Sequence, residues 1–219
     1  FENPDVVHVE GSVDPIRDID TIETELLLAD LETVDGSLER IKKQATHNKE
    51  LAPTAALLQR CSDALKTGKP VRALGIDDPE DLKILHGFGL ITAKKVLYVA
   101  NVAESAPHGE SELVPRVRER AKAEGAAVVP VCSKLESELA ELSKEDQAEM
   151  LASLGMTEPA LATLARAAYE LLDMSVYYTA GPKEIRAWQI PRHCSAPKAA
   201  GVIHTDFEKG FIRAEVYGV

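Results

Sequence analysis

Residues 96–104 read Val-Leu-Tyr-Val-Ala-Asn-Val-Ala-Glu, and the rest of the chain can be organised around this stretch. A short, continuous apolar run such as residues 96–100 predicts a strand that is buried on both faces of a sheet. Ligands of open α/β sheets bind just beyond the carboxyl ends of the strands, where this sequence places Asn101 and Glu104. An amide and a carboxylate suit the edge of a nucleobase, although an Asn after a strand is also an ordinary turn residue.

The apolar stretch is followed by a second one of the same kind. A charged amphipathic helix is predicted over residues 111–124, and Gly125 ends it. Residues 126–131 then form another apolar run, which ends at Cys132-Ser133-Lys134. Strand, helix and strand predict a right-handed parallel βαβ unit. Its polar strand ends, Asn101 and Ser133, are expected at the same edge of the sheet.

Composition excludes several classes of protein. The chain has 219 residues, of which 45% are hydrophobic, so it can form one large domain or two modest ones and is not globally disordered. No apolar run approaches the roughly 20 residues of a membrane helix, and we expect no membrane partner. Three distant cysteines without a C-x-x-C motif favour reduced thiols and a cytoplasmic location. The net charge of −11 argues against broad nucleic-acid binding, and no DNA partner is expected.

A helical hairpin is predicted before residue 70. Asp20-Thr21-Ile22-Glu23 has the form of a capping box and predicts a helix start. Apolar residues then recur at alternating steps of four and three, as in a coiled coil, at Leu27, Leu31, Val34, Leu38, Ile41 and Ala45. A second helix is expected from Pro53 to about Leu65, before Gly68 and Pro70. Two antiparallel helices explain this pattern, and one helix packed on a globular core is the alternative for the first helix.

A helix start is predicted at residues 77–81, with Gly87 and Gly89 interrupting that helix, and further helices are expected between residues 135 and 172.

The predicted secondary structure and the charge of the chain both change near residue 175. Alternating patterns then predict strands over residues 176–179, 184–190 and 211–216. Residues 175–219 carry six Lys or Arg against four Asp or Glu, whereas the rest is acidic. A small β-rich module is therefore expected at this end.

The sequence lacks several familiar catalytic patterns. No G-x-x-x-x-G-K-[ST] phosphate-binding loop occurs in the 219 residues, because Gly68-Lys69-Pro70 has neither the spacing nor the hydroxyl. His193-Cys194 has no distant partners with metal-ligand spacing, so a structural role is favoured and no metal site is predicted. No Ser-His-Asp arrangement can be argued from the order of the residues.

Several stretches together resemble one known family. They are Phe1-Glu2-Asn3 through His8, Gly11 to Ile19, the hairpin after Asp20, Tyr98 to Glu104, Tyr178 to Gly181 with Glu184 to Trp188, and Ala200 to Ala214. The chain resembles, nearly end to end, the YchF subfamily of Obg-related P-loop NTPases, also called Obg-like ATPases. These proteins are GTPase-like in fold but prefer ATP. The resemblance implies an α/β fold in which a partial P-loop NTPase sheet carries an inserted helical hairpin and precedes a β-rich TGS-like module.

The resemblance also implies domain boundaries. Residues 1–20 and 89–174 correspond to the G-domain-like part, residues 21–88 to the hairpin insertion, and residues 175–219 to an incomplete TGS-like domain. Family members hold the P-loop, the switch regions and the ligands of Mg²⁺ in a segment that would precede Phe1. We therefore expect residues 1–219 alone to be unable to hydrolyse a nucleotide.

The base-binding residues follow from the same resemblance. Asn101 and Glu104 match the family's N-x-x-E motif, where related GTPases have N-K-x-D, with an Asp that accepts two hydrogen bonds from guanine. The changed motif implies loss of the guanine preference, and Asn101 is expected to meet N6 and N7 of adenine. Val102 and Phe1 match apolar positions that contact the adenine faces. Backbone amides of the loop Cys132-Ser133-Lys134 match the second base-binding segment, in which Cys132 replaces a common Ser.

Activity and partners are implied in the same way. His8 matches a histidine of a mobile loop that is proposed to assist hydrolysis by positioning water or stabilising charge. The implied function is a slow, ribosome- or translation-associated switch that binds ATP with Mg²⁺ and hydrolyses it to ADP and phosphate, with the ribosome or ribosomal RNA as partner. His204 and Asp206 are expected to be structural or to face a partner. The alternative function is a non-catalytic module that binds RNA or protein.

Overall fold

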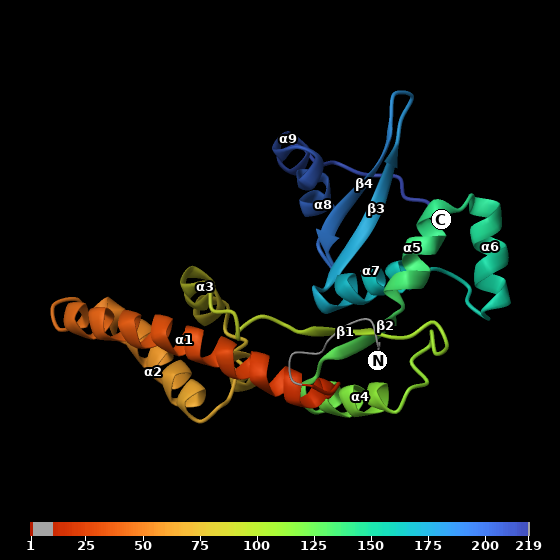
Figure 1. Cartoon of the computed structure of the whole chain (residues 1–219). Helices are drawn as coiled ribbons and strands as arrows, with labels where there is room; N and C mark the ends of the chain where they lie inside the picture. The colour runs from red at the N-terminus through yellow and green to blue at the C-terminus, as the bar shows by residue number, and fades with distance from the viewer. Residues whose placement is uncertain (2–10, 219) are drawn as a thin grey trace. The chain divides into compact units, whose positions relative to one another are not determined.

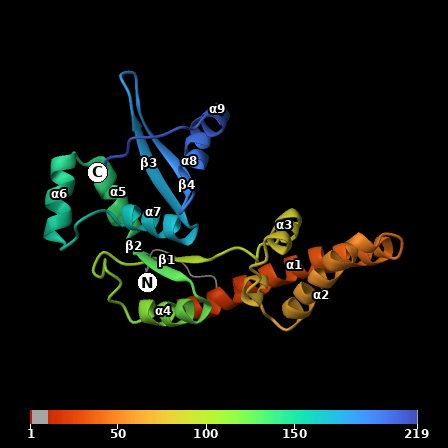
Figure 2. The same ribbon diagram turned by 180° about the vertical axis from the view of Figure 1, so that it is seen from behind.

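The computed structural model describes Phe1 and residues 11–218, and Figures 1 and 2 show its helices and strands from two opposite sides. The chain divides into two compact units, Phe1–Leu142 and Ser143–Val219. Each unit is described by itself. His8 and the short strand expected around it lie outside the described residues.

The first unit begins with a long helix, α1 (Pro15–Ala45). Asp14 caps it, since its Oδ1 accepts hydrogen bonds from the backbone N of Ile16 at 3.1 Å and of Arg17 at 3.4 Å. The helix start predicted at Asp20 was therefore wrong. Asp14-Pro15 is the stronger start signal because proline at the first helical position has a preset φ and lacks the N–H that would be unsatisfied there.

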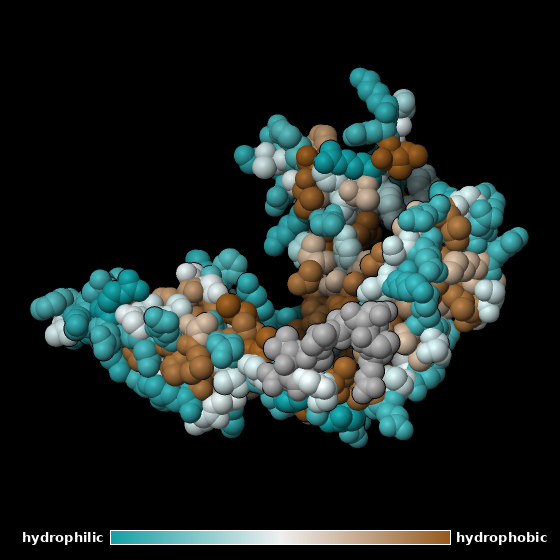
Figure 3. Space-filling view, viewed as in Figure 1, coloured by the Kyte–Doolittle hydropathy of each residue, from teal (hydrophilic) through white to brown (hydrophobic). Residues whose placement is uncertain are grey.

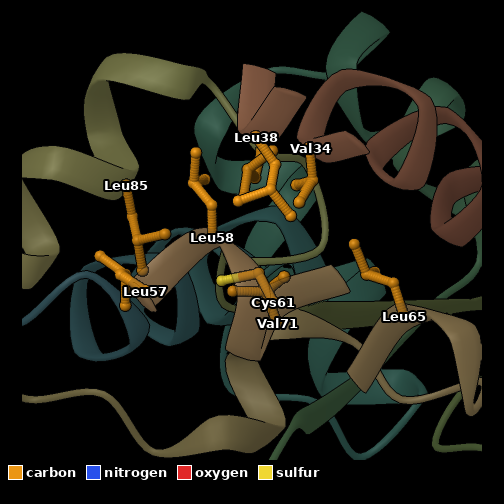
Figure 4. Packing of buried hydrophobic residues seen from close by; sticks show 9 residues of the cluster. Val34, Leu38, Leu57, Leu58, Cys61, Leu65, Val71 and Leu85 are labelled. Atoms are coloured by element: carbon orange, nitrogen blue, oxygen red, sulfur yellow. The ribbon is translucent and has the colours of Figure 1, made fainter. Parts of the chain in front are cut away.

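The antiparallel hairpin was predicted correctly. The turn η1 (Lys49–Leu51) leads into α2 (Ala52–Lys66), which packs along α1. Figure 4 shows side chains of α1 and α2 facing one another in the buried cluster. Residues of the following segment complete this cluster, which consists of Val34, Leu38, Leu57, Leu58, Cys61, Leu65, Val71, Leu85 and Leu90. Two helices alone would leave much of this apolar surface in water, so the later residues stabilise the hairpin.

The chain leaves the hairpin through η2 (Val71–Leu74) and α3 (Pro79–Phe88). Gly87 lies inside α3 and does not interrupt it, whereas Gly89 ends it with a φ of 64°. One buried carboxylate, that of Asp30 on α1, fixes the segment that follows. It accepts hydrogen bonds from the backbone N of Ile91 at 2.9 Å and from the N and Oγ1 of Thr92 at 2.7 and 2.6 Å. Three donors satisfy a carboxylate that is only 3% exposed.

The predicted βαβ unit is present. It consists of β1 (Leu97–Asn101), α4 (Leu113–Glu124) and β2 (Ala127–Val131), with the two strands parallel. The prediction that β1 is buried on both faces was wrong, because Val99 is 50% exposed. Among the described residues β1 pairs only with β2, and α4 packs against this small sheet. Burial on both faces requires cover on both faces, which a two-stranded sheet with one packed helix does not have.

A cluster of charged side chains holds the hairpin to the βαβ unit. Arg120 on α4 forms ion pairs with Glu23 of α1 at 2.9 Å and with Glu124 one turn further along α4. Arg72 of η2 also pairs with Glu23 and lies 3.5 Å from Glu124. Tyr98 of β1 donates its hydroxyl hydrogen to Glu124 at 2.8 Å. Half-buried groups in one network interact more strongly than isolated surface pairs.

The second unit contains a two-stranded antiparallel sheet, β3 (Met174–Ala180) with β4 (Ile185–Pro191). Its helices are α6 (Lys144–Ser153), α7 (Ala160–Leu171), α8 (Ala196–Ile203) and α9 (Thr205–Lys209). Two of the three predicted strands are confirmed. The strand predicted over residues 211–216 was wrong: this segment has no strand partner among the described residues, and Ile212 is 91% exposed. Alternation favours an extended chain, but a strand also needs a neighbouring edge.

The surface carries apolar groups in places. Figure 3 shows hydrophilic side chains at the outer end of the hairpin, with apolar side chains nearer its base.

Across Phe1 and residues 11–218, no helix combines the length and the apolar character needed to span a bilayer.

Candidate functional site

The candidate site lies where β1 and β2 end. Asn101 is opposite Val131 in the parallel register, so both strands finish at the same edge. The N–H of Val102 donates to the carbonyl of Val131 at 3.0 Å, which extends the pairing one residue beyond β1. Immediately after β2 the chain turns into α5 (Ser133–Glu141). The predicted meeting of the two polar strand ends is confirmed.

Ser133 fixes the side chain of Asn101. The Oδ1 of Asn101 accepts hydrogen bonds from the hydroxyl of Ser133 at 2.9 Å and from its backbone N at 3.3 Å. An amide oxygen has two lone pairs, and both are used here. Among the described residues, the Nδ2 group of Asn101 donates to no neighbour. Asn101 is thus oriented as a hydrogen-bond donor at the exposed edge of the sheet.

Glu104 and Lys134 form an ion pair across the same edge. The Nζ of Lys134 lies 2.7 Å from Oε2 of Glu104 and 3.9 Å from Oε1 of Glu138. The hydrogen bond to Glu104, and then its negative charge, raise the pKa of Lys134 above its usual value, so the ammonium stays charged at neutral pH. Both partners are exposed to solvent. The carboxylate of Glu104 therefore already has a cationic partner.

Cys132 and Val102 are buried behind these polar groups. Cys132 is 3% and Val102 4% exposed. Cys132 occupies the position before α5, and its carbonyl accepts from the backbone N of Glu136 at 3.0 Å. Because its thiol is buried, Cys132 can contribute to an exposed ligand only through its backbone. This agrees with the backbone role expected for the loop, which stays a prediction.

A pocket of about 270 Å³ adjoins Asn101. Phe1, Asn101 and Val102 all line it, so the structure brings together both apolar residues expected to contact adenine and the expected polar one. The rest of the lining comes from β1, from the beginning of α1 with the segment before it, and from α4 with the loop before it: Val13, Pro15, Asp18, Ile19, Tyr98, Val99, Ala100, Ser111, Leu113, Val114 and Val117. The volume is slightly below the roughly 300 Å³ at which the range for small-molecule pockets begins.

Two parts of a catalytic site are not seen here. His8 lies outside the described residues, so its catalytic role stays a prediction. The described residues contain no group of three or more His, Cys, Asp or Glu side chains that could hold a metal ion.

Sequence reasoning missed two side chains. It assigned residues 132–134 a backbone role, whereas the hydroxyl of Ser133 and the ammonium of Lys134 each engage a residue of the N-x-x-E motif. Parallel strands that end at the same edge bring Asn101 beside the second residue after β2, which is Ser133. A short polar side chain in that place is the signal that could have predicted the contact with Asn101.

Comparison with known proteins gives consistent results for the sequence and for the fold. Residues 174–219 match the family model YchF-GTPase_C, whose description is "Protein of unknown function (DUF933)". The chain is 47% identical to the "Ribosome-binding ATPase YchF" of Haemophilus influenzae, over 99% of this chain and 59% of that protein. Identity is 43% with the Bacillus subtilis protein of the same name, over 98% and 59%. It is 37% with "Obg-like ATPase 1" of Rattus norvegicus, over 99% and 56%.

The fold is similar to that of a solved structure, "Structure of the Schizosaccharomyces pombe YchF GTPase". The TM-score is 0.83 at 31% sequence identity, over 96% of this chain and 58% of that one. The chain thus spans a little under three fifths of the length of the curated relatives quoted above. Over nearly its whole length, the chain is similar in sequence and in fold to proteins of the YchF family.

Proposed function

We propose that the protein binds a purine nucleotide at the carboxyl ends of β1 and β2 and acts as an ATPase. The observation that carries this proposal is the side chain of Asn101, whose Oδ1 is held by Ser133 while its amide nitrogen is left to donate beside a pocket. N7 of a purine is a hydrogen-bond acceptor and suits this donor. The names of the relatives, ribosome-binding ATPase and Obg-like ATPase, support ATP as the substrate.

Of the two hydrogen bonds expected between Asn101 and adenine, the geometry favours the one to N7. Asn101 can donate to N7, but its oxygen already accepts two hydrogen bonds and has no lone pair left for the amino group on N6. N7 is shared by adenine and guanine. Preference for ATP over GTP must therefore come from another group. Glu104 is the one charged residue of the N-x-x-E motif.

Hydrolysis to ADP and phosphate belongs to the proposal, with Mg²⁺ bound alongside the phosphates of ATP. We assign binding of the phosphates and of Mg²⁺ to a segment corresponding to the part of the longer relatives that this chain does not span. Mg²⁺ would neutralise charge on the phosphates during transfer. His8 is proposed to orient the attacking water. The hydrolysis is proposed to be slow and switch-like, in the cytoplasm and at the ribosome.

A second candidate function is a module that binds RNA and hydrolyses nothing. The observation that favours it lies in the second unit, where the guanidinium of Arg186 stacks 4.2 Å above the ring of Trp188 on β4. Stacked Arg and aromatic side chains on a strand are used to hold unpaired bases. The slight excess of basic residues after residue 175 agrees with this function.

The test of the proposed function uses the protein at its full natural length. Binding of fluorescent ATP and GTP analogues gives the two affinities, and phosphate release is measured with and without purified ribosomes. We expect ATP to bind more tightly and ribosomes to change the rate of phosphate release. Binding of ribosomal RNA without any nucleotide binding would replace the ATPase with the second candidate.

A further inference from the structure

We propose that Lys134 is a specificity-determining residue of the site: by pairing with Oε2 of Glu104, it weakens that carboxylate as an acceptor for guanine. This inference rests on the proposed function, because it concerns the choice between two nucleotides at the same site. It adds a role for a side chain that sequence reasoning had placed only as a backbone contributor.

The ion pair is short and its partners come from opposite sides of the site. Glu104 follows β1, and Lys134 is the second residue of α5, which follows β2. Their N–O distance is 2.7 Å, whereas the alternative partner of Lys134, Glu138 on the same helix, is 3.9 Å away. Lys134 therefore bridges the two strand ends rather than folding back onto its own helix.

The chemistry of the two bases makes this bridge selective. Guanine presents the N–H groups of N1 and N2 on one edge, and a carboxylate with open oxygens accepts both of them. Adenine has an acceptor at N1 and no amino group at C2, so it gains nothing from an open carboxylate there. An ammonium on one oxygen of the carboxylate offsets its negative charge and takes up part of its accepting capacity, so guanine's two donors are met less well than by an open carboxylate.

Ser133 and Lys134 act on different residues of the motif, and only Lys134 bears on the choice between the two bases. Ser133 fills the oxygen of Asn101 and leaves its amide donor for N7, which is an acceptor in both purines. Lys134 places its ammonium on Oε2 of Glu104, the carboxylate that guanine's donors would otherwise meet. A site can discriminate by disfavouring one ligand as well as by attracting the other.

The magnitude follows from the exposure of the pair. Lys134 and Glu104 side chains are 67% and 46% exposed, so solvent screens their attraction. Removal of an exposed pair of this kind should change the ratio of GTP affinity to ATP affinity by about two- to fivefold. The effect is smaller than a full switch of specificity, because other groups also contribute.

The experiment measures that ratio in the full-length protein for wild type, Lys134→Met, Lys134→Arg, and Lys134→Met combined with Glu104→Gln. Lys134→Met should raise the ratio about two- to fivefold. Lys134→Arg should restore the wild-type ratio, because the cation is retained. The double variant should show a smaller rise or none, since a neutral amide with one accepting oxygen replaces the released carboxylate. Lys122→Met, on an exposed residue of α4 with the same change of charge, is the matched control and should leave the ratio unaltered.

Ionic strength provides a second readout that a merely structural role would not alter. Added salt weakens the pair, so the ratio should rise with salt in wild type and stay flat in Lys134→Met. A wild type that prefers ATP while Lys134→Met keeps the same ratio and the same salt response overturns the role of Lys134 and leaves the proposed function intact. A wild type that binds neither nucleotide overturns both proposals.

Discussion

The hydroxyl of Ser133 lies 2.9 Å from the amide oxygen of Asn101, and this one contact joins the ends of two parallel strands through side chains. The backbone N of Ser133 reaches the same oxygen at 3.3 Å. The residue that would read a base is therefore oriented by a residue that need not touch the base at all. Removing the orienting hydroxyl separates these two roles experimentally.

Ser133→Ala should weaken the binding of ATP and of GTP together. One neutral hydrogen bond is worth about 1 kcal/mol, so the expected loss of affinity is about fivefold for each nucleotide. Titration with fluorescent nucleotides measures it. Ser137→Ala, on an exposed residue of the same helix, is the matched control. Wild-type affinity in Ser133→Ala would show that the hydroxyl does not orient Asn101.

Asn101→Ala should lower the affinities for ATP and GTP by a similar factor, about tenfold, because N7 is present in both bases. The ratio of the two affinities is then unchanged, in contrast to the expected behaviour of Lys134→Met. Equilibrium binding of both nucleotides tests this. Asn48→Ala, in the turn between α1 and α2, serves as control. A loss confined to ATP would mean that Asn101 contacts N6 after all.

Tyr98 should titrate at unusually high pH. Burial first, and then the hydrogen bond to Glu124, raise its pKa to about 12. A tyrosine in an unfolded chain has a pKa of about 10. The folded state therefore holds the proton more tightly, so the stabilisation by this group is complete below about pH 10 and is lost as the pH rises towards 12.

Two measurements check the titration of Tyr98. Phenolate absorbance of wild type minus that of Tyr98→Phe should show a step above pH 10 that belongs to this residue. Urea unfolding should show that the stability advantage of wild type over Tyr98→Phe shrinks as the pH rises above about 10. Tyr178→Phe, on a side chain that is 62% exposed, is the control. A Tyr98 step at the ordinary pKa would contradict the burial of its hydroxyl beside Glu124.

Leu58→Ala should destabilise the hairpin strongly. Leu58 is 0% exposed and lies between α1 and the residues that follow α2. Loss of a fully buried leucine side chain costs about 2–5 kcal/mol, depending on how far the cavity collapses. Leu28→Ala, on the same hairpin at a position that is 55% exposed, should cost far less. Chemical denaturation followed by helical circular dichroism compares the two, and equal losses would refute the described packing.

The parts of the fold that the sequence predicts well are those in which local signals agree with packing. The seam through Val34 and Leu38 predicted the face that α2 covers, and the two apolar runs predicted a parallel pair whose polar ends meet. Both depend on periodicity within one segment, which the sequence carries directly. The contact between Asn101 and Ser133 follows from the register of that pair, yet its side-chain detail required coordinates.

The parts that the sequence does not predict depend on partners elsewhere in the chain. Asp30 is an acidic residue beside the apolar seam of α1. Nothing near it in sequence shows that the backbone N–H groups of Ile91 and Thr92 will donate hydrogen bonds to its carboxylate. Residues 211–216 alternate like a strand but find no strand partner among the described residues. Val99 belongs to an apolar run and is nevertheless half exposed. In each of these examples the outcome depends on a distant neighbour, which one segment does not encode.

The position of the Asp30 carboxylate makes the length of the hairpin independent of its attachment to the rest of the unit. This carboxylate holds α1 to the segment that follows α3, so the hairpin is attached near Asp30. The turn around residues 46–49, at the other end of the hairpin, takes no part in that attachment. Helical turns added in matched pairs at the far end would lengthen the arm by about 1.5 Å per residue in each helix. The length of the hairpin can thus change while the hydrogen bonds of Asp30 and the edge of the β1–β2 sheet stay as they are.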